Sequence, residues 1–261
     1  MAQSPMKEPE SISNTRPHLL ICAGVDPTGG AGLVRDIETA THFGVSTSVA
    51  VTAITAQDNH KVHDVWPLSG SWVLAQMQAA LGAHPVRAIK IGMLGTTEIA
   101  VAVANLLEAY PLIPTVLDPV LKASSGGSLA DQGMAATIIT ELLPKITLLT
   151  PNIYELATLT TGKLAKNAEE AIQQAQSLLH KGARSILIKG GHATYQEHKI
   201  SDILVGLEKV EHFSLPRLPM LKRGTGCSLA SAIGAGWARG QETTLAITQA
   251  KAYVHQYLQR P

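Results

Sequence analysis

Short apolar runs recur along the chain, about every 25 to 40 residues, with segments of helical periodicity between them. Five of the runs are almost continuously apolar, which is typical of strands whose two faces are both covered by helices. They are residues 18–23, 88–92, 114–118, 146–150 and 184–189. The pattern predicts an α/β protein in which helices cover both faces of a mostly parallel central sheet.

Two of the intervening segments carry apolar residues three or four positions apart, which is the spacing of an amphipathic helix. One stripe consists of Ile99, Val103, Leu106 and Tyr110, and the other consists of Ile172, Ala175 and Leu179. The second segment begins at Asn167, with Glu170 at capping-box spacing, and ends at Gly182. Both helices are expected to pack on the sheet.

Strands of a different kind are predicted in two other places. Residues 45–53 alternate between larger apolar and small side chains, and residues 199–205 and 209–215 indicate a late hairpin. Strands joined by a short turn run antiparallel, so the sheet is expected to be mixed at one edge.

The composition is that of an ordinary globular protein. The chain has 261 residues, of which 45% are hydrophobic, enough to bury a sizeable core without disulfides or a metal. No linker or repeat interrupts residues 18–261, so we expect a single domain over that range. Residues 1–17 mix prolines and charged residues and lack the apolar core of a signal peptide. We expect them to form a disordered N-terminal tail.

Charge and cysteine content narrow the class of partner. Lys plus Arg is 21 and Asp plus Glu is 20, so the net charge of +1 provides no basic surface for nucleic acid or anionic lipid. The longest uncharged stretch, residues 65–86, contains prolines and polar residues and is not expected to span a membrane. Cys22 and Cys227 form no CxxC pair, which favours a cytoplasmic protein without a structural zinc site. The expected partner is a small molecule.

In open α/β sheets, ligands bind at the carboxyl ends of the strands, so the residues that follow each predicted strand are site candidates. The first strand is followed by Gly24-Val-Asp-Pro-Thr-Gly-Gly-Ala-Gly32, whose glycines let a backbone approach a ligand closely. This segment matches neither a dinucleotide-binding fingerprint nor a P-loop. The alternative is a structural Asx-Pro turn at Asp26 and Pro27.

A second glycine-rich turn, Gly224-Thr-Gly-Cys227, leads into a helix of small residues that carries no charge through Ala238. The N-terminus of such a helix offers free N–H groups and a partial positive charge, which suit a phosphate or a transferring phosphoryl group. The helix dipole is expected to lower the pKa of Cys227, which would let this residue act as a base. The alternative is that Cys227 is a small buried hydrophobic residue.

The segment Thr150-Pro-Asn-Ile-Tyr-Glu155 follows another predicted strand and places Asn152 and Glu155 three positions apart. This pair could hold a hydrated Mg²⁺, but taken alone it is better explained as the capping box of a helix. Asp118 and Lys189 end two other predicted strands, so an acid and a base arrive at the same edge of the sheet. This convergence favours a functional interpretation of all these residues.

Gln57 and Met93 follow two further predicted strands. An amide can pair with donor and acceptor atoms on the edge of a neutral heteroaromatic ring, and a thioether can pack on the face of the ring. The residues alone therefore indicate phosphoryl transfer to a small neutral ring alcohol.

With these motifs in order, the chain resembles the hydroxymethylpyrimidine/phosphomethylpyrimidine kinases of thiamine biosynthesis, a family of the ribokinase-like superfamily. The resemblance covers nearly the whole chain and rests on residues 23–32, 55–57, 90–94, 117–120, 150–155, 189–192 and 224–227. Sugar kinases of the superfamily carry aspartate where this chain has Cys227, which favours the vitamin kinases. The resemblance implies a ribokinase-like three-layer sandwich.

The resemblance also implies a role for each candidate residue. The aminopyrimidine would be surrounded by Asp36, Gln57, Met93, Val120 and the backbone of Gly24. The ATP and phosphate side would consist of Asn152, Glu155 and Lys189, with Asp118 and Glu155 near the magnesium ion. Gly224, Thr225 and Gly226 would form the anion hole, and Cys227 would face the hydroxymethyl group.

The implied reaction is transfer of the γ-phosphoryl group of Mg-ATP to the hydroxymethyl oxygen, followed by a second transfer onto the resulting monophosphate. A homodimer is usual in the family, and a monovalent cation is a further candidate cofactor beside ATP and Mg²⁺. Two other functions stay open, a pyridoxal/pyridoxine kinase on the same scaffold and a non-catalytic pyrimidine-binding protein.

The chain departs from the family pattern in two places. Leu221-Lys222-Arg223 stands where the family usually carries Asn-Thr-His, and the chain ends at Pro261 without the Gly- and His-containing tail of many members. Both departures bear on the nucleotide lid and on the second transfer. We expect Arg223 to assist a phosphate.

Overall fold

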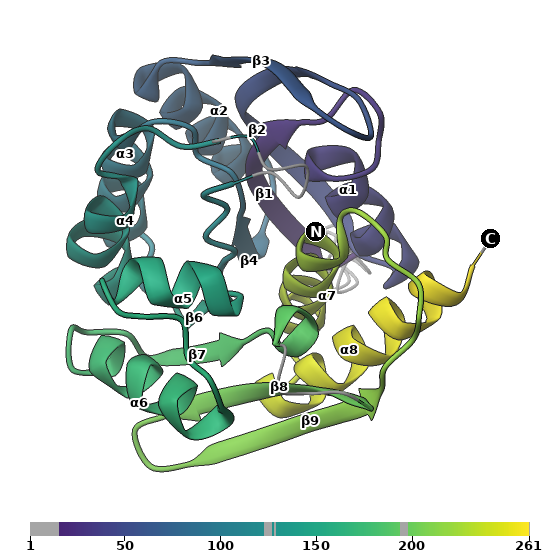
Figure 1. The fold of residues 1–261 in the computed structure, drawn as a ribbon. Coiled ribbons are helices and arrows are strands. Elements are labelled where there is room, and N and C mark those ends of the chain that lie inside the picture. The colour runs from purple at the N-terminus through teal and green to yellow at the C-terminus, as the bar shows by residue number, and fades with distance from the viewer. Residues whose placement is uncertain (1–15, 123–126, 128, 194–197, 261) are drawn as a thin grey trace, which may run out of the picture.

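The computed structural model describes residues 16–122, 127, 129–193 and 198–260. Within these residues one nine-stranded sheet runs through the molecule in the order β3-β2-β1-β4-β5-β6-β7-β8-β9 (Figure 1). The strands are β1 (His18–Val25), β2 (Ser46–Gln57), β3 (Val62–Pro67), β4 (Val86–Ile91), β5 (Thr115–Leu117), β6 (Leu148–Leu149), β7 (Ser185–Ile188), β8 (Lys199–Gly206) and β9 (Val210–Pro216). Except for Arg16 and Pro17, the predicted tail lies outside the described residues.

Helices occupy most of the connections between the strands. They are α1 (Gly32–His42), α2 (Gly70–Ala83), α3 (Thr97–Glu108), α4 (Met134–Thr137), α5 (Ile153–Leu159), α6 (Ala168–Leu179), α7 (Thr225–Ala238) and α8 (Thr243–Gln259). Short π and 3₁₀ segments are η1 (Ile138–Leu142), η2 (Leu143–Lys145) and η3 (Gly190–His192). None of the helices in the described part of the chain is long and apolar enough to cross a membrane.

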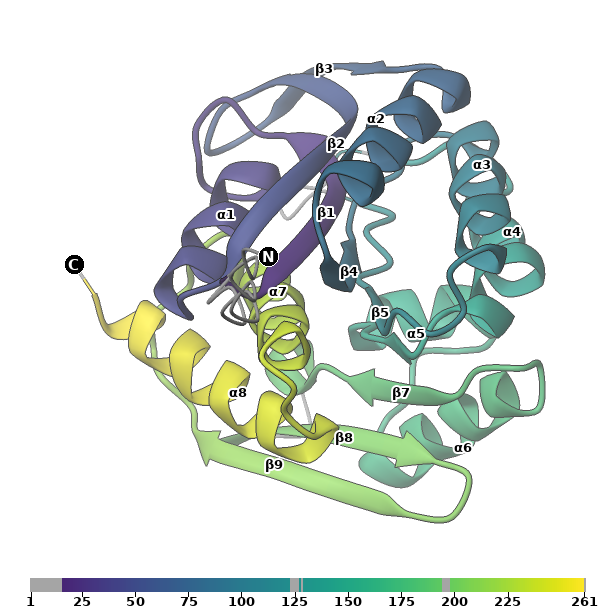
Figure 2. The same ribbon diagram turned by 180° about the vertical axis from the view of Figure 1, so that it is seen from behind.

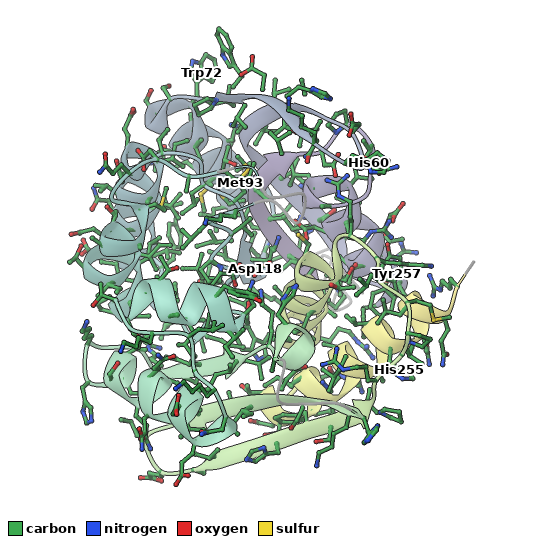
Figure 3. The ribbon with its side chains drawn as sticks, viewed as in Figure 1. His60, Trp72, Met93, Asp118, His255 and Tyr257 are labelled. Atoms are coloured by element: carbon green, nitrogen blue, oxygen red, sulfur yellow. The ribbon has the colours of Figure 1, made fainter. Side chains whose placement is uncertain are left out.

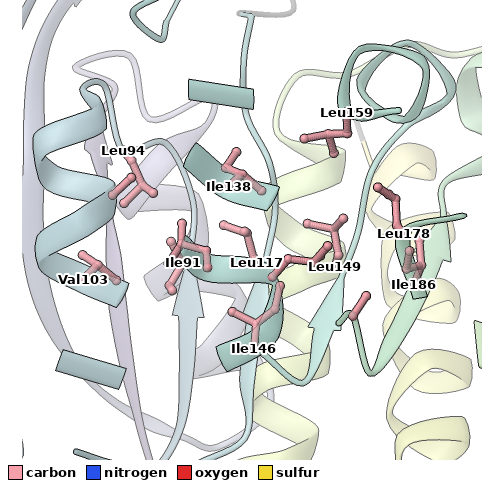
Figure 4. Packing of buried hydrophobic residues seen from close by; sticks show 14 of the residues in the cluster. Ile91, Leu94, Val103, Leu117, Ile138, Ile146, Leu149, Leu159, Leu178 and Ile186 are labelled. Carbon is pink, nitrogen blue, oxygen red and sulfur yellow. The ribbon is translucent and has the colours of Figure 1, made fainter. Parts of the chain in front are cut away.

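The sheet separates two hydrophobic cores, and together these layers form a three-layer α/β sandwich (Figures 1 and 2). Leu20 and Cys22 of β1 pack with α2, α3, α5 and α6, whereas Leu19 and Ile21 pack with α1, α7 and α8. Figure 4 shows the first of these cores, in which Leu117 and Leu149 lie side by side between the helices. The strand is apolar without alternation because both of its faces are buried, as the sequence predicted.

The strand directions confirm a mostly parallel sheet and correct one detail. The six central strands, from β2 to β7 in the sheet order, are parallel, and β8 and β9 run antiparallel as the hairpin pattern predicted. The opposite edge is also antiparallel, because β3 pairs with the end of β2. The sequence analysis did not predict β3. Its side chains are exposed or partly exposed, so the strand lacks the buried apolar face that a hydrophobic pattern would have indicated.

Local signals at one helix are confirmed in detail. The side chain of Asn167 accepts a hydrogen bond from the backbone N–H of Glu170 (2.9 Å), and α6 starts at the next residue, Ala168. Gly182, with φ of 102°, adopts the left-handed conformation that ends such a helix. The capping residues therefore placed both ends of α6 correctly.

Candidate active site

The predicted site residues gather at the carboxyl ends of the parallel strands and at the N-terminus of α7. Met93 follows β4 and Asp118 follows β5, and Figure 3 shows Asp118 beside α7. Lys189 follows β7, and its backbone N–H donates to the carbonyl of Pro151 (2.8 Å), next to Asn152. The topology thus brings together side chains that lie more than a hundred positions apart in the sequence.

A lysine between two carboxylates forms one half of the site. Nζ of Lys189 lies 2.6 Å from Oδ1 of Asp118 and 3.4 Å from Oε2 of Glu155. Burial acts to lower the pKa of Lys189, but the two carboxylates outweigh burial and hold that pKa above its usual value. Burial raises the pKa of Glu155, and the nearby negative charge of Asp118 adds to that rise. The ammonium is therefore fully charged at neutral pH.

Asn152 and Glu155 form the capping box that the sequence offered as the simpler interpretation. Oδ1 of Asn152 accepts from the backbone N–H groups of Tyr154 and Glu155 (both 2.9 Å), and Oε2 of Glu155 accepts from the N–H of Asn152 (2.7 Å). The amide oxygen of Asn152 is thus engaged by its own helix, and only Glu155 also reaches Lys189. Glu155 therefore both caps the helix and contacts the charged group around Lys189.

The glycine-rich turn before α7 lies directly against this charged group. A Cβ atom at Gly226 would lie 3.4 Å from Nζ of Lys189 and 3.5 Å from Oδ2 of Asp118. Gly224 has φ of 75°, and a Cβ there would lie only 2.3 Å from the carbonyl oxygen of Gly30. The two glycine-rich turns are therefore packed against each other. The first N–H groups of α7, which have no acceptor within the helix, begin at Thr225.

The electrostatic environment of Cys227 corrects the prediction from the helix dipole. Burial raises the pKa of the Cys227 thiol to about 11, although the ammonium of Lys90 acts to lower it. The backbone N–H of Gly32 hydrogen bonds to the sulfur and also favours the thiolate. The expectation of a lowered pKa is therefore wrong, because a thiolate would lose more hydration than these groups replace.

Beneath Cys227 lies an ion pair in which both partners are fully buried. Nζ of Lys90 lies 2.6 Å from Oδ2 of Asp36, and the hydroxyl of Ser231, one turn after Cys227 on α7, donates to Oδ1 (2.8 Å). Both carboxylate oxygens of Asp36 are thus engaged by protein groups. This placement contradicts the expectation that Asp36 contacts the ring, because its side chain is 0% exposed.

Lys90 is a residue of the site that sequence reasoning passed over. It is fully buried in β4, where burial acts to lower the pKa of its ammonium but the Asp36 carboxylate keeps that pKa above its usual value. The signal was present in the sequence, since Lys90 is the one charged residue in the apolar run 88–92. A lone charge inside a buried strand requires a buried partner of opposite charge.

The opposite half of the site is apolar. A Cβ atom at Gly24 would lie 3.0 Å from the sulfur of Met93, and Met93 packs with Ala53 and Leu129 in a small cluster that Val120 joins. The structure therefore brings together Gly24, Met93 and Val120 as expected. A flat apolar ring could be covered by these residues.

Gln57 and Arg223 lie at the border between the two halves. Nη2 of Arg223 donates to Oε1 of Gln57 (2.9 Å) and to Oδ2 of Asp26 (3.1 Å). Asp26 also forms the expected Asx turn, since its Oδ1 accepts from the backbone N–H of Thr28 (2.9 Å). Arg223 thus faces protein acceptors on the ring side, and its expected role at a phosphate stays a prediction.

Comparison with known proteins assigns the class. The sequence model of a family described as phosphomethylpyrimidine kinase matches residues 26–261. A hydroxymethylpyrimidine/phosphomethylpyrimidine kinase of Rhizobium meliloti is 37% identical over 237 residues, which are 90% of this chain and 88% of that protein. These matches and the site define a small-molecule kinase.

Solved structures support the same class. The pyridoxal kinase of Staphylococcus aureus in complex with pyridoxal has a TM-score of 0.86 at 31% identity and covers 94% of this chain and 89% of its own. The same enzyme with AMP-PCP has a TM-score of 0.83 at 32% identity, covering 94% and 88%. A phosphomethylpyrimidine kinase of Clostridium difficile has a TM-score of 0.80 at 32% identity, covering 93% and 99%.

The fold is thus ribokinase-like, as the resemblance implied. A solved kinase of the same fold binds the ATP analogue AMP-PCP, which supports ATP as the phosphoryl donor. The chain belongs to the phosphomethylpyrimidine kinase family.

Proposed function

We propose that the protein phosphorylates 4-amino-5-hydroxymethyl-2-methylpyrimidine with ATP and then phosphorylates the monophosphate to the diphosphate, in thiamine biosynthesis. The observation that carries the proposal is the contact between the turn Gly224–Gly226 and the Lys189–Asp118 pair, beside the apolar patch of Met93. A phosphoryl group and a neutral ring would each find suitable partners there. The family membership supports the same substrates.

The two halves of the site have separate tasks in this mechanism. Lys189 and the N–H groups at the start of α7 neutralise the negative charge on the transferring phosphoryl group. Gln57, Met93 and Val120 hold the ring so that its hydroxymethyl oxygen faces the phosphate, which converts the transfer into an oriented, effectively unimolecular step. Cys227 lies between the halves, where it faces the attacking hydroxyl.

The high pKa of Cys227 fits a loose phosphoryl transfer. With a pKa of about 11, Cys227 is almost entirely a neutral thiol near neutral pH. In a loose transition state the hydroxyl loses its proton late, so the enzyme needs no strong base at the start of the reaction. Only the thiolate form of Cys227 can accept the proton of the hydroxyl as the bond to phosphorus forms, giving the thiol. With a pKa of about 11 this form is a small fraction near neutral pH, so the rate of transfer should rise as the pH rises.

Magnesium is part of the proposal. Asp118 and Glu155 supply two carboxylates around one ammonium, and Mg²⁺ takes one or two carboxylates while it keeps several waters. These donors fit the ion, which would neutralise charge on the ATP phosphates. Omission of Mg²⁺ should abolish turnover, and Asp118→Asn should raise the Mg²⁺ concentration required for half-maximal rate.

The direct test is ATP consumption by the purified protein with the hydroxymethylpyrimidine, followed by mass spectrometry of the products. We expect the monophosphate first and the diphosphate later. A product series that stops at the monophosphate contradicts the second transfer. Binding of the pyrimidine without any ATP consumption would instead identify a non-catalytic binding protein.

Pyridoxal kinase is the second candidate, because the similar Staphylococcus aureus structure contains pyridoxal. A pyridine with a hydroxymethyl group could also lie on Met93 and face Cys227. The ratio of kcat/KM for the pyrimidine to that for pyridoxal decides between the two. We expect this ratio to exceed one.

We also propose a homodimer. Large apolar side chains are exposed next to one another in the sheet at Ile54 of β2 and its partner Trp66 of β3, which are 54% and 70% exposed. Burial of such a pair between two copies is favourable. Light scattering should give twice the chain mass, and Trp66→Ser should shift the protein toward the monomer.

The cytoplasm is the proposed site of action. Cys22 and Cys227 are both free thiols, which suits a reducing compartment. Fractionation of cells should recover the protein with cytoplasmic enzymes.

A further inference from the structure

The segment before α7 is connected to the ring side of the site by one arginine. Besides its bonds to Gln57 and Asp26, Arg223 donates from Nη1 to the backbone carbonyl of Asp58 (2.9 Å) and to Oδ1 of Asn59 (3.4 Å). The side chain of Arg223 is 19% exposed and that of Asp26 is 2% exposed, so their ion pair is largely shielded from water. Arg223 therefore holds a fixed position at the end of β2.

The backbone of Arg223 is held as well. The hydroxyl of Tyr257 in α8 donates to the carbonyl oxygen of Arg223 (3.3 Å), and the guanidinium of Arg35 lies over the Tyr257 ring at 4.6 Å (Figure 3 labels Tyr257). An arginine held at both its backbone and its side chain loses little further freedom when a ligand binds.

This contact decides which way the side-chain amide of Gln57 points. A guanidinium only donates hydrogen bonds, so Gln57 must present its oxygen to Arg223. Its nitrogen then points away and donates to Oγ1 of Thr55 (2.9 Å), whose own proton goes to the carbonyl of Val25 (2.8 Å). The reversed amide would place two donors against each other at Arg223. The orientation is therefore set by chemistry.

Counting donors and acceptors shows what remains for a ligand. A glutamine amide offers two lone pairs and two N–H groups. Among the described residues, Arg223 takes one lone pair and Thr55 takes one N–H, which leaves one acceptor and one donor on the same amide. A ring edge on which an amine lies next to a ring nitrogen can use both groups. The amine donates to the amide oxygen and the ring nitrogen accepts from the amide N–H, as in the contact of glutamine with adenine.

We propose that Arg223 is a specificity-determining positioning residue, which fixes the amide of Gln57 so that the site prefers rings with an amine next to a ring nitrogen. The inference rests on the proposed function, because it takes Gln57 to contact the ring. Aminopyrimidines carry such an edge. Pyridoxal lacks it, so the same contact discriminates against the second candidate substrate.

A direct role at a phosphate is the competing explanation for Arg223. Both terminal nitrogens of the guanidinium already have protein acceptors, and among the described residues only Nε lacks one. To bind a phosphate through its fork, Arg223 would have to leave the nearly buried Asp26 carboxylate without its partner. Leaving a buried charge unpaired is costly, so the positioning role is favoured.

The test is a double-mutant cycle on ligand affinity. Binding of the hydroxymethylpyrimidine and of pyridoxal is measured by calorimetry without ATP, for the wild type, Arg223→Met, Gln57→Leu and the double variant. Arg223→Met should weaken pyrimidine binding about tenfold and change pyridoxal binding less than about twofold. In the Gln57→Leu background, Arg223→Met should have almost no further effect on pyrimidine binding.

Two variants control for charge and for folding. Arg239 is exposed and directly follows the last residue of α7, so Arg239→Met removes the same charge at the other end of that helix and should change neither affinity. Arg223→Lys keeps a charge beside Asp26 but not the planar fork, and it serves if Arg223→Met does not fold. It should also weaken pyrimidine binding more than pyridoxal binding.

Three results would overturn the inference. The first is equal loss of affinity for both rings. The second is a full effect of Arg223→Met in the Gln57→Leu background. The third is a loss confined to the pyrimidine monophosphate, which would assign Arg223 to a phosphate.

Failure of the proposed function would look different. If the wild type binds neither ring, the side-chain amide NMR signals of Gln57 in the ligand-free protein still test the fixed orientation. They are assigned by their loss in Gln57→Leu. A shift of these signals in Arg223→Met supports the inference, and unchanged signals overturn it.

Discussion

Two lysine–aspartate pairs lie near Cys227, with the same separation of 2.6 Å but different burial. Lys90 and Asp36 are both 0% exposed, whereas Lys189 is 13% exposed and Asp118 3% exposed. Both lysines interact electrostatically with Cys227. The same pair of residue types therefore occurs twice, once below the site and once at its opening.

The difference in burial predicts different roles for the two pairs. A fully buried ammonium cannot exchange its carboxylate for a ligand, so Lys90 stabilises the floor of the site and supplies a fixed positive charge under Cys227. Lys189 is reachable and lies against the turn Gly224–Gly226, so it can share its charge with an incoming phosphate. Sequence motifs alone do not reveal which lysine is the buried structural charge and which can reach a phosphate.

The largest effect is expected on kcat when Cys227, which lies near both pairs, is replaced. Cys227→Ala should lower kcat roughly 10²- to 10⁴-fold, because the proton of the substrate hydroxyl loses its acceptor. Cys22→Ala serves as the control, since Cys22 is buried in β1 and belongs to the core. A drop of less than about tenfold would mean that Cys227 only lines the site and is not the proton acceptor.

The free energy of unfolding should distinguish the buried Lys90–Asp36 pair from the more exposed Lys189–Asp118 pair. Lys90→Met leaves the buried carboxylate of Asp36 unpaired and should lower the free energy of unfolding by about 3–5 kcal/mol. Lys189→Met should lower it much less, because water reaches that pair. Urea unfolding followed by circular dichroism measures both.

A double variant provides the control for this experiment. Lys90→Met with Asp36→Leu removes both buried charges and should recover most of the lost stability. Equal losses in Lys90→Met and Lys189→Met would contradict the distinction between the pairs.

The pH dependence of thiol modification tests the raised pKa of Cys227 directly. A pKa of about 11 lies well above the ordinary thiol value of 9.0, so at pH 8 Cys227 should react with iodoacetamide about a hundredfold more slowly than an ordinary thiol. Because only the thiolate reacts, the rate should rise tenfold per pH unit between pH 7 and pH 10. Mass spectrometry distinguishes Cys227 from Cys22, whose pKa burial raises to about 12. A plateau near pH 8 would contradict the raised pKa.

The smallest effect is expected on KM for ATP when Lys189 of the more exposed pair is replaced. Lys189→Ala should raise KM for ATP about tenfold, more than it lowers kcat, because it removes a charge that binds the phosphates before and during transfer. Lys145→Ala is the matched control, since Lys145 forms a 2.8 Å ion pair with Glu108 before β6, at the opposite end of the sheet. A selective loss of kcat would assign Lys189 to the transition state alone.

The parts of the site that were predicted from the sequence are those with local signals. The Asx turn at Asp26, the capping box of Asn152 and Glu155 and the convergence of Asp118 with Lys189 all followed from spacing and from strand ends. The pKa of Cys227 could not be predicted in this way, because its direction depends on how much protein surrounds the sulfur. Asp36 was misplaced for a similar reason, since its partner Lys90 lies 54 positions away.

Local patterns along the chain were sufficient to predict the α/β class, most of the strands, the ends of α6 and the candidate chemistry, because hydrophobic periodicity and capping act over a few residues. Three features became visible only in the folded protein: β3 extends the sheet, Lys90 pairs with Asp36, and Arg223 donates to Gln57. The last contact joins residues 166 positions apart, and no local pattern encodes it. Contacts of that kind arise only when the fold brings distant segments together and removes water from between them.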